Sequence, residues 1–527
     1  MRIRYLKIAA ATPLLFFVFI SALIASPDYV DSRFFDINNE VETSSGVRYA
    51  SALNDGFLIS KDHGQTWRRI NNGLPKKIVY PFNNEEIETL TSIGFNPVNE
   101  SSLFCTTASK IYISENAGVN WTNLPVKSPI SRNDVLTSVS QSPFNSNAFL
   151  VTTTFSGIYE TLDGGKTWAE VAPKTIIYRG AGFQEEIASV AYSPTERGVI
   201  YLAYAYGNGL YKSNASRTGW TKIKGLSEEN SIVNIQFCGD TLKVSFRDGY
   251  ADYNCETGSW SSMKPSLIHK SEQNTARISR MKIAEDRKAI YVGTWHATGE
   301  RLQKHLAFME RNGLDSIIVD IKDDYGFLTY GSKLEMPNKI GAVKDRIHIE
   351  NLVAEAHKRG FYVIGRIVVF KDKQLYNYNN YEYALQDKYK DGPWRNLIKH
   401  TDDDTGEVSY NQLEFWVDPF KEKVWRYNAE IAEELQSLGV DEIQFDYIRL
   451  PTDGDLSRID FSNEHPGMTR INALESFFKL VRQTIHVPIS TDLYGFNCYY
   501  RMGNWNGQNI DMFSNYVDVI CPMWYPS

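Results

Sequence analysis

One stretch decides the fold of the C-terminal half of the chain: Val440-Asp441-Glu442-Ile443-Gln444-Phe445-Asp446-Tyr447-Ile448-Arg449-Leu450-Pro451. Ile443 and Phe445 alternate with polar residues, which is typical of a strand with one apolar face. The strand ends at Asp446, and Arg449 follows where the chain should open into a loop. In barrels of parallel strands, the carboxyl ends of the strands carry the reactive side chains. The stretch therefore predicts a buried strand with a candidate site at its end.

Two other apolar segments follow the same plan. Residues 487–495 place Asp492 at the end of a strand, and residues 316–324 place Asp320 there. Because the carboxyl ends of parallel strands meet at one rim, we expect the three carboxylates to converge. Cleavage of a glycosidic bond needs a pair of carboxyl groups, so this rim indicates a glycoside hydrolase.

The segments around these strands alternate between helix and strand. Apolar residues recur at helical spacing before Gly313, Gly360 and Gly439, and each glycine leads into an apolar run. This rhythm predicts helices capped by glycine and followed by buried parallel strands. We expect six strands, near residues 289–295, 314–321, 361–370, 440–448, 487–493 and 517–524. A (β/α)8 or TIM-type barrel has eight, so residues 287–527 are expected to form a barrel that is incomplete at its C-terminus.

The N-terminal half repeats a different unit. Ser60–Trp67 recurs as Ser114–Trp121 and as Thr161–Trp168, and weaker copies end at Trp220 and Trp260. The tryptophans are 54, 47, 52 and 40 residues apart, the size of a four-stranded propeller blade. We therefore expect a β-propeller over residues 30–265 and a linker over residues 266–286. The copies resemble the Asp-box, or BNR, repeats of sialidase-type propellers, and the resemblance implies a structural turn in a binding or spacer module.

The C-terminal half also resembles a known family. Residues 289–527 are similar to an uncharacterised family of glycosyl hydrolase-like (β/α)8 barrels. The similarity lies in Tyr291–Trp295, Val319–Asp323, Phe445–Pro451, Ser490–Asp492 and Met523–Ser527. The resemblance implies hydrolysis of a polysaccharide and does not specify the sugar.

The three carboxylates suit different catalytic roles. Asp446, beside Phe445 and close to Arg449, should stay ionised and act as nucleophile or base. Asp492 is the candidate acid, provided that apolar neighbours raise its pKa. Asp320 could fill either role. The alternative is that Asp446 only forms a salt bridge with Arg449, while the other two cap turns between strand and helix.

Further rim residues are candidates for substrate binding. Aromatic rings at strand ends can stack on sugar faces, and Arg366 should face the lumen, where it could bind substrate or pair with a carboxylate. The alternative for the rings is packing at the barrel lip. The candidates are Trp295, His296, Arg366, Tyr447, Arg449, Tyr494, Trp524 and Tyr525. The sequence has no CxxC and no His-x-His at a strand end, so we predict neither metal nor cofactor.

Charge and the N-terminus restrict the location of the protein. A net charge of −7 without a basic cluster argues against nucleic-acid binding. Arg2, Arg4 and Lys7 precede an uncharged run from Ile8 to Ala25. This layout predicts a signal peptide or signal anchor over residues 1–27, with the rest of the chain exported. We expect an extracytoplasmic protein, either secreted or held at the membrane through its N-terminal segment.

Two functional hypotheses follow. The first is an exported glycoside hydrolase that acts on a polysaccharide by a two-carboxylate mechanism. The second is a non-catalytic scaffold of the cell envelope, in which a propeller and a degenerate barrel bind glycan or protein. The discriminating observation is whether the carboxyls of Asp446 and Asp492 face one cleft within about 10 Å of each other, which favours the enzyme, or whether either points into the helix layer.

Overall fold

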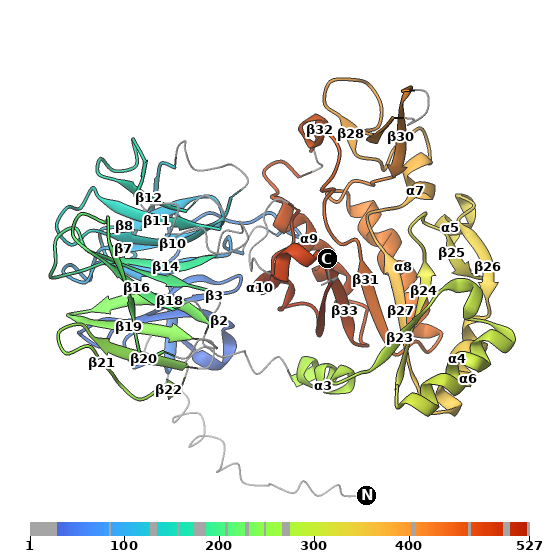
Figure 1. Cartoon of the computed structure of the whole chain (residues 1–527), viewed down its shortest axis with the longest axis horizontal. Helices are drawn as coiled ribbons and strands as arrows, with labels where there is room; N and C mark the ends of the chain where they lie inside the picture. Colours follow the sequence, from blue (N-terminus) through green and yellow to red (C-terminus); the bar gives the residue numbers. More distant parts are fainter. Residues whose placement is uncertain are drawn as a thin grey trace, which may run out of the picture.

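The computed structural model describes residues 29–523, except for residues 84–85, 127–133, 155–156, 172–185, 206–208, 227–230, 247–248, 266–274, 402–405, 462–464 and 499–505. A β-propeller and an α/β domain lie side by side (Figure 1). The segment predicted as a signal, residues 1–27, lies outside the described residues. Within the described part of the chain, no helix is long and apolar enough to span a membrane.

The propeller has five blades, each an antiparallel sheet. Blade 1 contains β1 (Val30–Asp31), β2 (Ile37–Glu42), β3 (Arg48–Ala52), β4 (Gly56–Ser60) and β5 (Thr66–Arg69); blade 2 contains β6 (Ser92–Phe95), β7 (Leu103–Thr106), β8 (Ile111–Ser114) and β9 (Thr122–Leu124). Blade 3 contains β10 (Leu136–Gln141), β11 (Phe149–Thr153), β12 (Ile158–Thr161) and β13 (Ala169–Glu170); blade 4 contains β14 (Ile187–Tyr192), β15 (Ile200–Tyr204), β16 (Leu210–Ser213) and β17 (Trp220–Ile223). Blade 5 contains β18 (Ile232–Cys238), β19 (Thr241–Phe246), β20 (Gly249–Asn254), β21 (Ser259–Trp260) and β22 (Lys264–Pro265). The ring closes where β18 packs against β2.

The repeated sequence forms one type of turn between the third and fourth strands of a blade. In blade 1, Asp62 accepts bonds from the backbone N–H (3.0 Å) and the hydroxyl (2.6 Å) of Thr66. Ser60 completes the turn, because its hydroxyl donates to Asp62 (2.7 Å) and accepts from the N–H of Gly64 (2.9 Å). The same backbone bond recurs from Asn120 to Asn116, from Thr167 to Asp163 and from Thr218 to Asn214. The turn is therefore also present in blade 4, where the sequence copy is weak.

The repeated tryptophans connect neighbouring blades. In three blades, the indole N–H donates to a backbone carbonyl just after the last strand of the preceding blade, which satisfies the one polar group of a large apolar side chain. The pairs are Trp121 with Ile70 (2.6 Å), Trp168 with Pro125 (3.1 Å) and Trp260 with Lys224 (2.8 Å).

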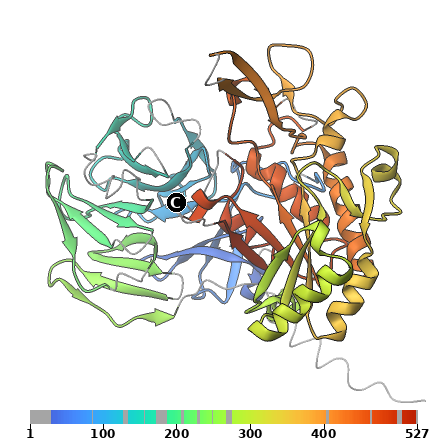
Figure 2. The ribbon, with the colours of Figure 1, turned by 45° about the vertical axis from the view of Figure 1, so that its right-hand side comes forward.

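The α/β domain contains six parallel strands in chain order. They are β23 (Ala289–Val292), β24 (Ser316–Lys322), β27 (Tyr362–Val368), β31 (Glu442–Asp446), β33 (Ile489–Leu493) and β34 (Val519–Pro522). Every strand lies where the sequence predicts one. The strands are connected through α4 (Gly299–Asn312), α6 (Ile349–Lys358), α8 (Glu422–Ser437) and α9 (Arg470–Val481). Among the described residues, β23 and β34 do not pair with each other, so the sheet is open and a closed TIM-type barrel is not shown (Figure 2).

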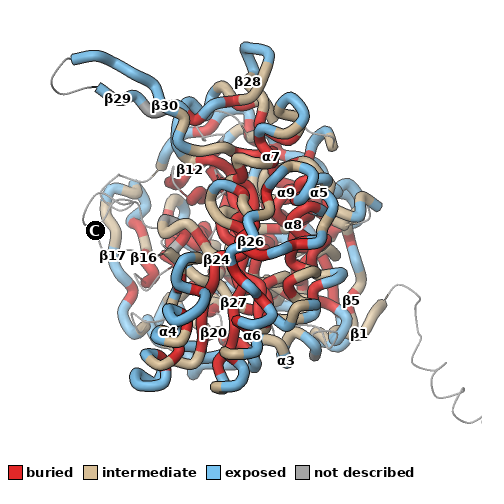
Figure 3. The backbone as a smooth tube through the Cα atoms, turned by 90° about the vertical axis from the view of Figure 1, so that its right-hand side faces the viewer, coloured by how far each residue is buried: buried red, intermediate tan, exposed pale blue. Residues whose placement is uncertain are grey.

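Shorter elements decorate this sheet. The predicted linker contains helix α3 (Thr275–Ala284), whose Arg280 forms an ion pair with Asp518 (3.1 Å). Figure 3 shows buried residues along β24 and β27, and an exposed hairpin of β29 and β30 that projects away from them. The remaining elements are η3 (Thr294–His296), β25 (Leu328–Tyr330), α5 (Glu335–Lys339), β26 (Val343–Ile347), α7 (Lys373–Asn377), β28 (Gln386–Asp387), β29 (Asn396–Thr401), β30 (Val408–Glu414), η4 (Leu456–Arg458), β32 (Ile459–Asp460), η5 (Gly495–Cys498) and α10 (Ile510–Phe513); η1 (Ser32–Phe34) lies in the propeller.

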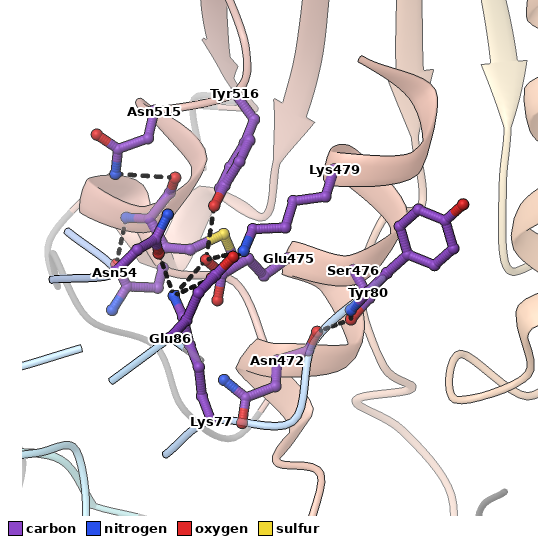
Figure 4. A network of polar contacts seen from close by, with 12 residues as sticks. Asn54, Lys77, Tyr80, Glu86, Asn472, Glu475, Ser476, Lys479, Asn515 and Tyr516 are labelled. Atoms are coloured by element: carbon purple, nitrogen blue, oxygen red, sulfur yellow. Dashed lines mark hydrogen bonds and ion pairs between the residues drawn. The ribbon is translucent and has the colours of Figure 1, made fainter. Parts of the chain in front are cut away.

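A buried network of charges joins the two domains (Figure 4). The connection between β5 and β6 leaves the propeller and places Lys77 against Glu475 of α9, with 2.6 Å between Nζ and Oε1 and neither side chain exposed. Lys479 of α9 forms an ion pair with Glu86 of the same connection. The hydroxyl of Tyr516 donates to Glu475 (2.6 Å). This network fixes the propeller to the helix that precedes β33.

Candidate active site

The alternation on β31 directs polar residues to the inside of the sheet. Gln444 and Asp446 lie on one face, whereas Phe445 points to the helices and packs edge-on against Phe477 of α9, with 5.0 Å between ring centroids. Asp446 is only 4% exposed. Because a buried carboxylate needs a partner, the inner face must supply a cation or donors.

Arg366 of β27 is that partner. Its Nε and Nη2 donate to Oδ2 of Asp446 at 3.0 and 2.5 Å, and its Nη1 donates to Asp320 at 2.7 Å. Asp324, after β24, lies 3.4 Å from Nη2. These carboxylates raise the pKa of Arg366 against the opposing effect of its burial. Of the two roles expected for Arg366, substrate binding or pairing with a carboxylate, the structure has it paired with Asp446 and Asp320.

Asp446 and Asp492 lie next to one another across β31 and β33. Burial, followed by the adjacent Asp446 carboxylate, raises the pKa of Asp492 to about 8, although Arg366 and Gln444 act in the opposite direction. Gln444 donates to Asp492 at 3.0 Å. Asp446 also accepts the backbone N–H of Tyr447 at 2.6 Å. The raised pKa of Asp492 favours the protonated form of this carboxyl at neutral pH.

Asp320 belongs to the same cluster. Besides Arg366, it accepts a hydrogen bond from the hydroxyl of Tyr291 on β23. The register of β24 shifts between Asp320 and Lys322, which is the effect of a β-bulge. The shift keeps Asp320 inside and sends Lys322 into the helix layer, where it pairs with Asp372 (2.8 Å).

Among the described residues, Asp446 forms no ion pair with Arg449, the partner that the alternative interpretation gave it. Arg449 donates instead to the carbonyl of Leu450 and the hydroxyl of Thr452, both at 3.2 Å. Its guanidinium carbon lies 5.1 Å from the ring centroids of Tyr447 and Tyr494. The chain turns sharply after Asp446, because Tyr447 has φ of 50°, and this turn directs Arg449 to the rings and away from the carboxylate.

The other predicted binding residues divide into two groups. Trp295 is 64% exposed and stacks against Arg346, and His296 contacts His305 of α4 at 3.2 Å. No described contact joins these two residues to the carboxylate cluster. Trp524 and Tyr525 lie outside the described residues.

Three residues of the cluster were not assigned from the sequence: Tyr291, Asp324 and Gln444. Gln444 stands two residues before Asp446, so the period of a strand already places both on one face. Tyr291 belongs to a stretch that was recognised only as part of a resemblance. Asp324 lies in the loop after β24, where strand periodicity no longer applies. In the part of the chain that is described, no group of three or more His, Cys, Asp or Glu residues is arranged to hold a metal ion.

Family models match both halves of the chain. Residues 289–527 match a family described as "Putative glycosyl hydrolase domain". Residues 55–233, within the propeller, match the family described as sortilin, neurotensin receptor 3. None of the curated proteins is similar enough to count as a match.

Solved structures similar to this chain include three of different kinds. A hypothetical protein from Ruminiclostridium thermocellum is 31% identical, with 38% of this chain and 96% of that protein covered and a TM-score of 0.33. The GH74 xyloglucanase from Xanthomonas campestris is 15% identical, with 44% and 38% covered and a TM-score of 0.31. Trehalose-6-phosphate hydrolase from Bacillus licheniformis is 16% identical, with 40% and 44% covered and a TM-score of 0.26. The chain spans less than half the length of the last two proteins.

Proposed function

We propose that this protein is an exported glycoside hydrolase that cleaves a polysaccharide with Asp446 and Asp492. The observation that carries the proposal is the difference between two adjacent carboxyl groups. Arg366 donates two hydrogen bonds to Asp446, whereas burial and the neighbouring Asp446 carboxylate raise the pKa of Asp492 to about 8. The match of residues 289–527 to a glycosyl hydrolase family supports the same class of reaction.

The two groups have complementary roles in this reaction. When substrate binds, the glycosidic oxygen replaces Asp446 as the acceptor of the Asp492 proton. Asp492 then donates this proton to the glycosidic oxygen. Asp446 then attacks the anomeric carbon as nucleophile, and Asp492, now ionised, activates the water that releases the sugar. A nucleophilic role of Asp446 corresponds to a retaining mechanism, in which the two carboxyls stand about 5–5.5 Å apart.

The surrounding residues support these roles. Arg366 fixes the orientation of Asp446, and Asp320 orients Arg366 from the opposite side. The ring of Tyr447 directly follows Asp446 and is partly exposed, so it is a candidate to stack on a sugar face. We propose that the open sheet is part of a (β/α)8 barrel whose inner face forms this site.

Export is a proposal that depends on the N-terminal sequence. The basic residues before the uncharged run of residues 8–25 support a signal peptide or anchor. A secreted or membrane-held enzyme would meet polysaccharides of the envelope or the surroundings, so these are the substrates to screen.

The test is Asp446→Asn, which preserves the shape of the side chain and removes its charge. Release of reducing ends from a panel of envelope and secreted polysaccharides should fall by at least about 1,000-fold, as expected when a nucleophile is lost. Asp391→Asn, at an exposed position of the same domain, is the matched control and should keep full activity. Turnover by the Asp446→Asn variant would remove Asp446 from the mechanism.

One observation favours the scaffold as a second candidate. A small hollow of about 30 Å³ lies between blades 1 and 5, lined by residues that include Asn39, Glu42, Lys243 and Tyr250. The ring of Tyr250 beside the ion pair of Lys243 and Glu42 is the feature that would suit a glycan-binding module. If the chain binds glycans without releasing reducing ends, and Asp446→Asn does not change that binding, the scaffold is the better description.

A further inference from the structure

A buried cation without an acidic partner follows Asp446 by three residues and lies against the rings of Tyr447 and Tyr494. Arg449 is only 6% exposed, and its Nε is buried without an acceptor. Among the residues that the structure describes, no carboxylate lies within ion-pair distance of its guanidinium. It donates hydrogen bonds to the carbonyl of Leu450 and the hydroxyl of Thr452, both of which are neutral oxygens. A buried charge of this kind is unfavourable unless something negative compensates it.

The neighbouring cations are already compensated. Arg366 lies between Asp446 and Asp320, and Lys371 lies 3.3 Å from Glu414. Among the described residues of this group, Arg449 is therefore the one positive charge without a carboxylate partner.

Aromatic rings frame the guanidinium of Arg449. Its central carbon lies 5.0 Å from the ring centroid of Trp416 and 5.1 Å from those of Tyr447 and Tyr494. Rings on several sides fix the plane of the guanidinium and limit its hydration, which prepares it to bind an oxyanion with two hydrogen bonds. Stacking on the rings would explain why the Arg449 side chain packs at this position. It would not explain why a charged residue occupies a position without a counter-ion.

The position of this group relates it to the reaction. Tyr447 directly follows Asp446, and Tyr494 follows Asp492 by two residues. Both rings therefore extend from the strand ends that carry the carboxyl pair, and Arg449 lies against both. A sugar bound at the pair would place its neighbouring substituents beside Arg449.

We propose that Arg449, framed by Trp416, Tyr447 and Tyr494, is a subsite for an oxyanion on the glycan. The substrate class is then an acidic polysaccharide that carries uronic-acid carboxylates or sulfate esters. This inference rests on the proposed function, because it names the substrate of the same site. The chain carries a net charge of −7, so it has no general attraction for polyanions, and their binding would depend on this local site.

The test is equilibrium binding to matched pairs of probes. Trigalacturonate is compared with its carboxyl-reduced form, and dextran sulfate with dextran, by calorimetry or intrinsic fluorescence of the intact protein. Binding of the charged member in either pair should be at least 10-fold tighter and should weaken with salt, and the pair that shows it identifies the oxyanion. Equal affinity for charged and neutral members in both pairs would overturn the proposal. This comparison uses the unaltered chain, so it does not depend on the folding of a variant.

Variants then assign the binding to Arg449. Arg449→Gln should weaken binding of the charged probe about 10- to 100-fold, which is the loss of a charge-assisted hydrogen bond. Arg449→Lys keeps the charge but lacks the planar guanidinium. Its affinity for the charged probe should lie between those of the wild type and Arg449→Gln. Arg33→Gln, an exposed arginine of the propeller, removes the same charge elsewhere and should have no effect. Unchanged binding in a folded Arg449→Gln protein would refute the subsite.

Binding and turnover separate this inference from the proposed function. If acidic probes bind through Arg449 but no glycan is cleaved, the subsite stands and the hydrolase fails. If a neutral glycan is cleaved through Asp446 while acidic glycans neither bind nor react, the hydrolase stands and the subsite fails.

Discussion

Replacement of Asp492 by asparagine should stabilise the protein, and the gain in stability should grow as pH rises from about 4 to about 8. The structure raises the pKa of this carboxyl from an ordinary 3.8 to about 8. The folded protein therefore keeps a proton that the unfolded chain releases near pH 4. As pH rises from about 4 to about 8, folding must retain this proton or accept a buried second anion, so the wild-type protein loses stability over that window.

The size of the effect follows from the raised pKa. Each pH unit between 3.8 and about 8 carries about 1.4 kcal/mol, so Asp492 costs about 4 kcal/mol at pH 7 and about 6 kcal/mol above pH 8. Asparagine cannot ionise, keeps an oxygen for Gln444 and offers an N–H toward Asp446. Asp492→Asn should therefore match the wild type at pH 4 and exceed its stability by an amount that grows with pH.

Unfolding by urea at pH 4, 6, 7 and 9 measures this difference. The transition of the α/β domain is followed by circular dichroism, and Asp391→Asn serves as the control for the loss of one exposed carboxylate. A constant difference between Asp492→Asn and the wild type at all pH values would refute the proton assignment. The same variant should lose glycan hydrolysis, because it has no proton to give to the leaving oxygen.

Two further predictions concern buried ion pairs. Lys77→Met leaves Glu475 buried and without its lysine, and should destabilise the junction of the two domains by about 3–5 kcal/mol in urea titrations. The double variant Lys77→Met/Glu475→Gln should recover most of the loss, and purely additive losses would contradict a coupled pair. Arg366→Gln leaves Asp320 and Asp446 facing each other without a cation, and should lower stability by a similar amount as well as abolish hydrolysis. A thermally stable and active Arg366→Gln protein would show that the cluster does not need its central charge.

Strand periodicity was sufficient to predict the parallel sheet and its inner carboxylates. Alternation along residues 440–446 identifies the inner face, and the same reasoning placed Asp320, Arg366 and Asp492 on neighbouring strands. The propeller was equally accessible, because each blade repeats its turn and its tryptophan. Closure of the sheet was not predictable in this way, since it depends on pairing between strands that are distant in the chain.

The partner of Asp446 could not be found from neighbours in the sequence. Arg449 lies three residues away and was the obvious candidate, but the positive φ of Tyr447 turns the chain and directs Arg449 elsewhere. The real partner, Arg366, lies 80 residues earlier and is brought alongside by the register of β27 with β31. Pairing between strands and not sequence distance decides which charges meet.

Helix α9 shows a similar limit. Its sequence places the polar residues Glu475 and Lys479 among apolar ones such as Phe477 and Phe478, and polar helical residues are usually solvated. In the structure the connection between β5 and β6 covers these polar residues, and Lys77 neutralises Glu475. A second domain that docks through charges leaves no apolar signal in the helix, so hydrophobic periodicity cannot reveal it.

The inner face of the sheet itself favours a functional site over a degenerate scaffold. The interior of a structural barrel is filled by branched apolar side chains in layers. Here β31 alone directs Glu442, Gln444 and Asp446 inward, all less than 10% exposed, and each requires a polar partner from an adjacent strand. Buried polar groups of this density are unfavourable for stability and are typically retained where function needs them. If Asp446→Asn and Asp492→Asn both left glycan hydrolysis and glycan binding unchanged, this polar interior would be structural after all.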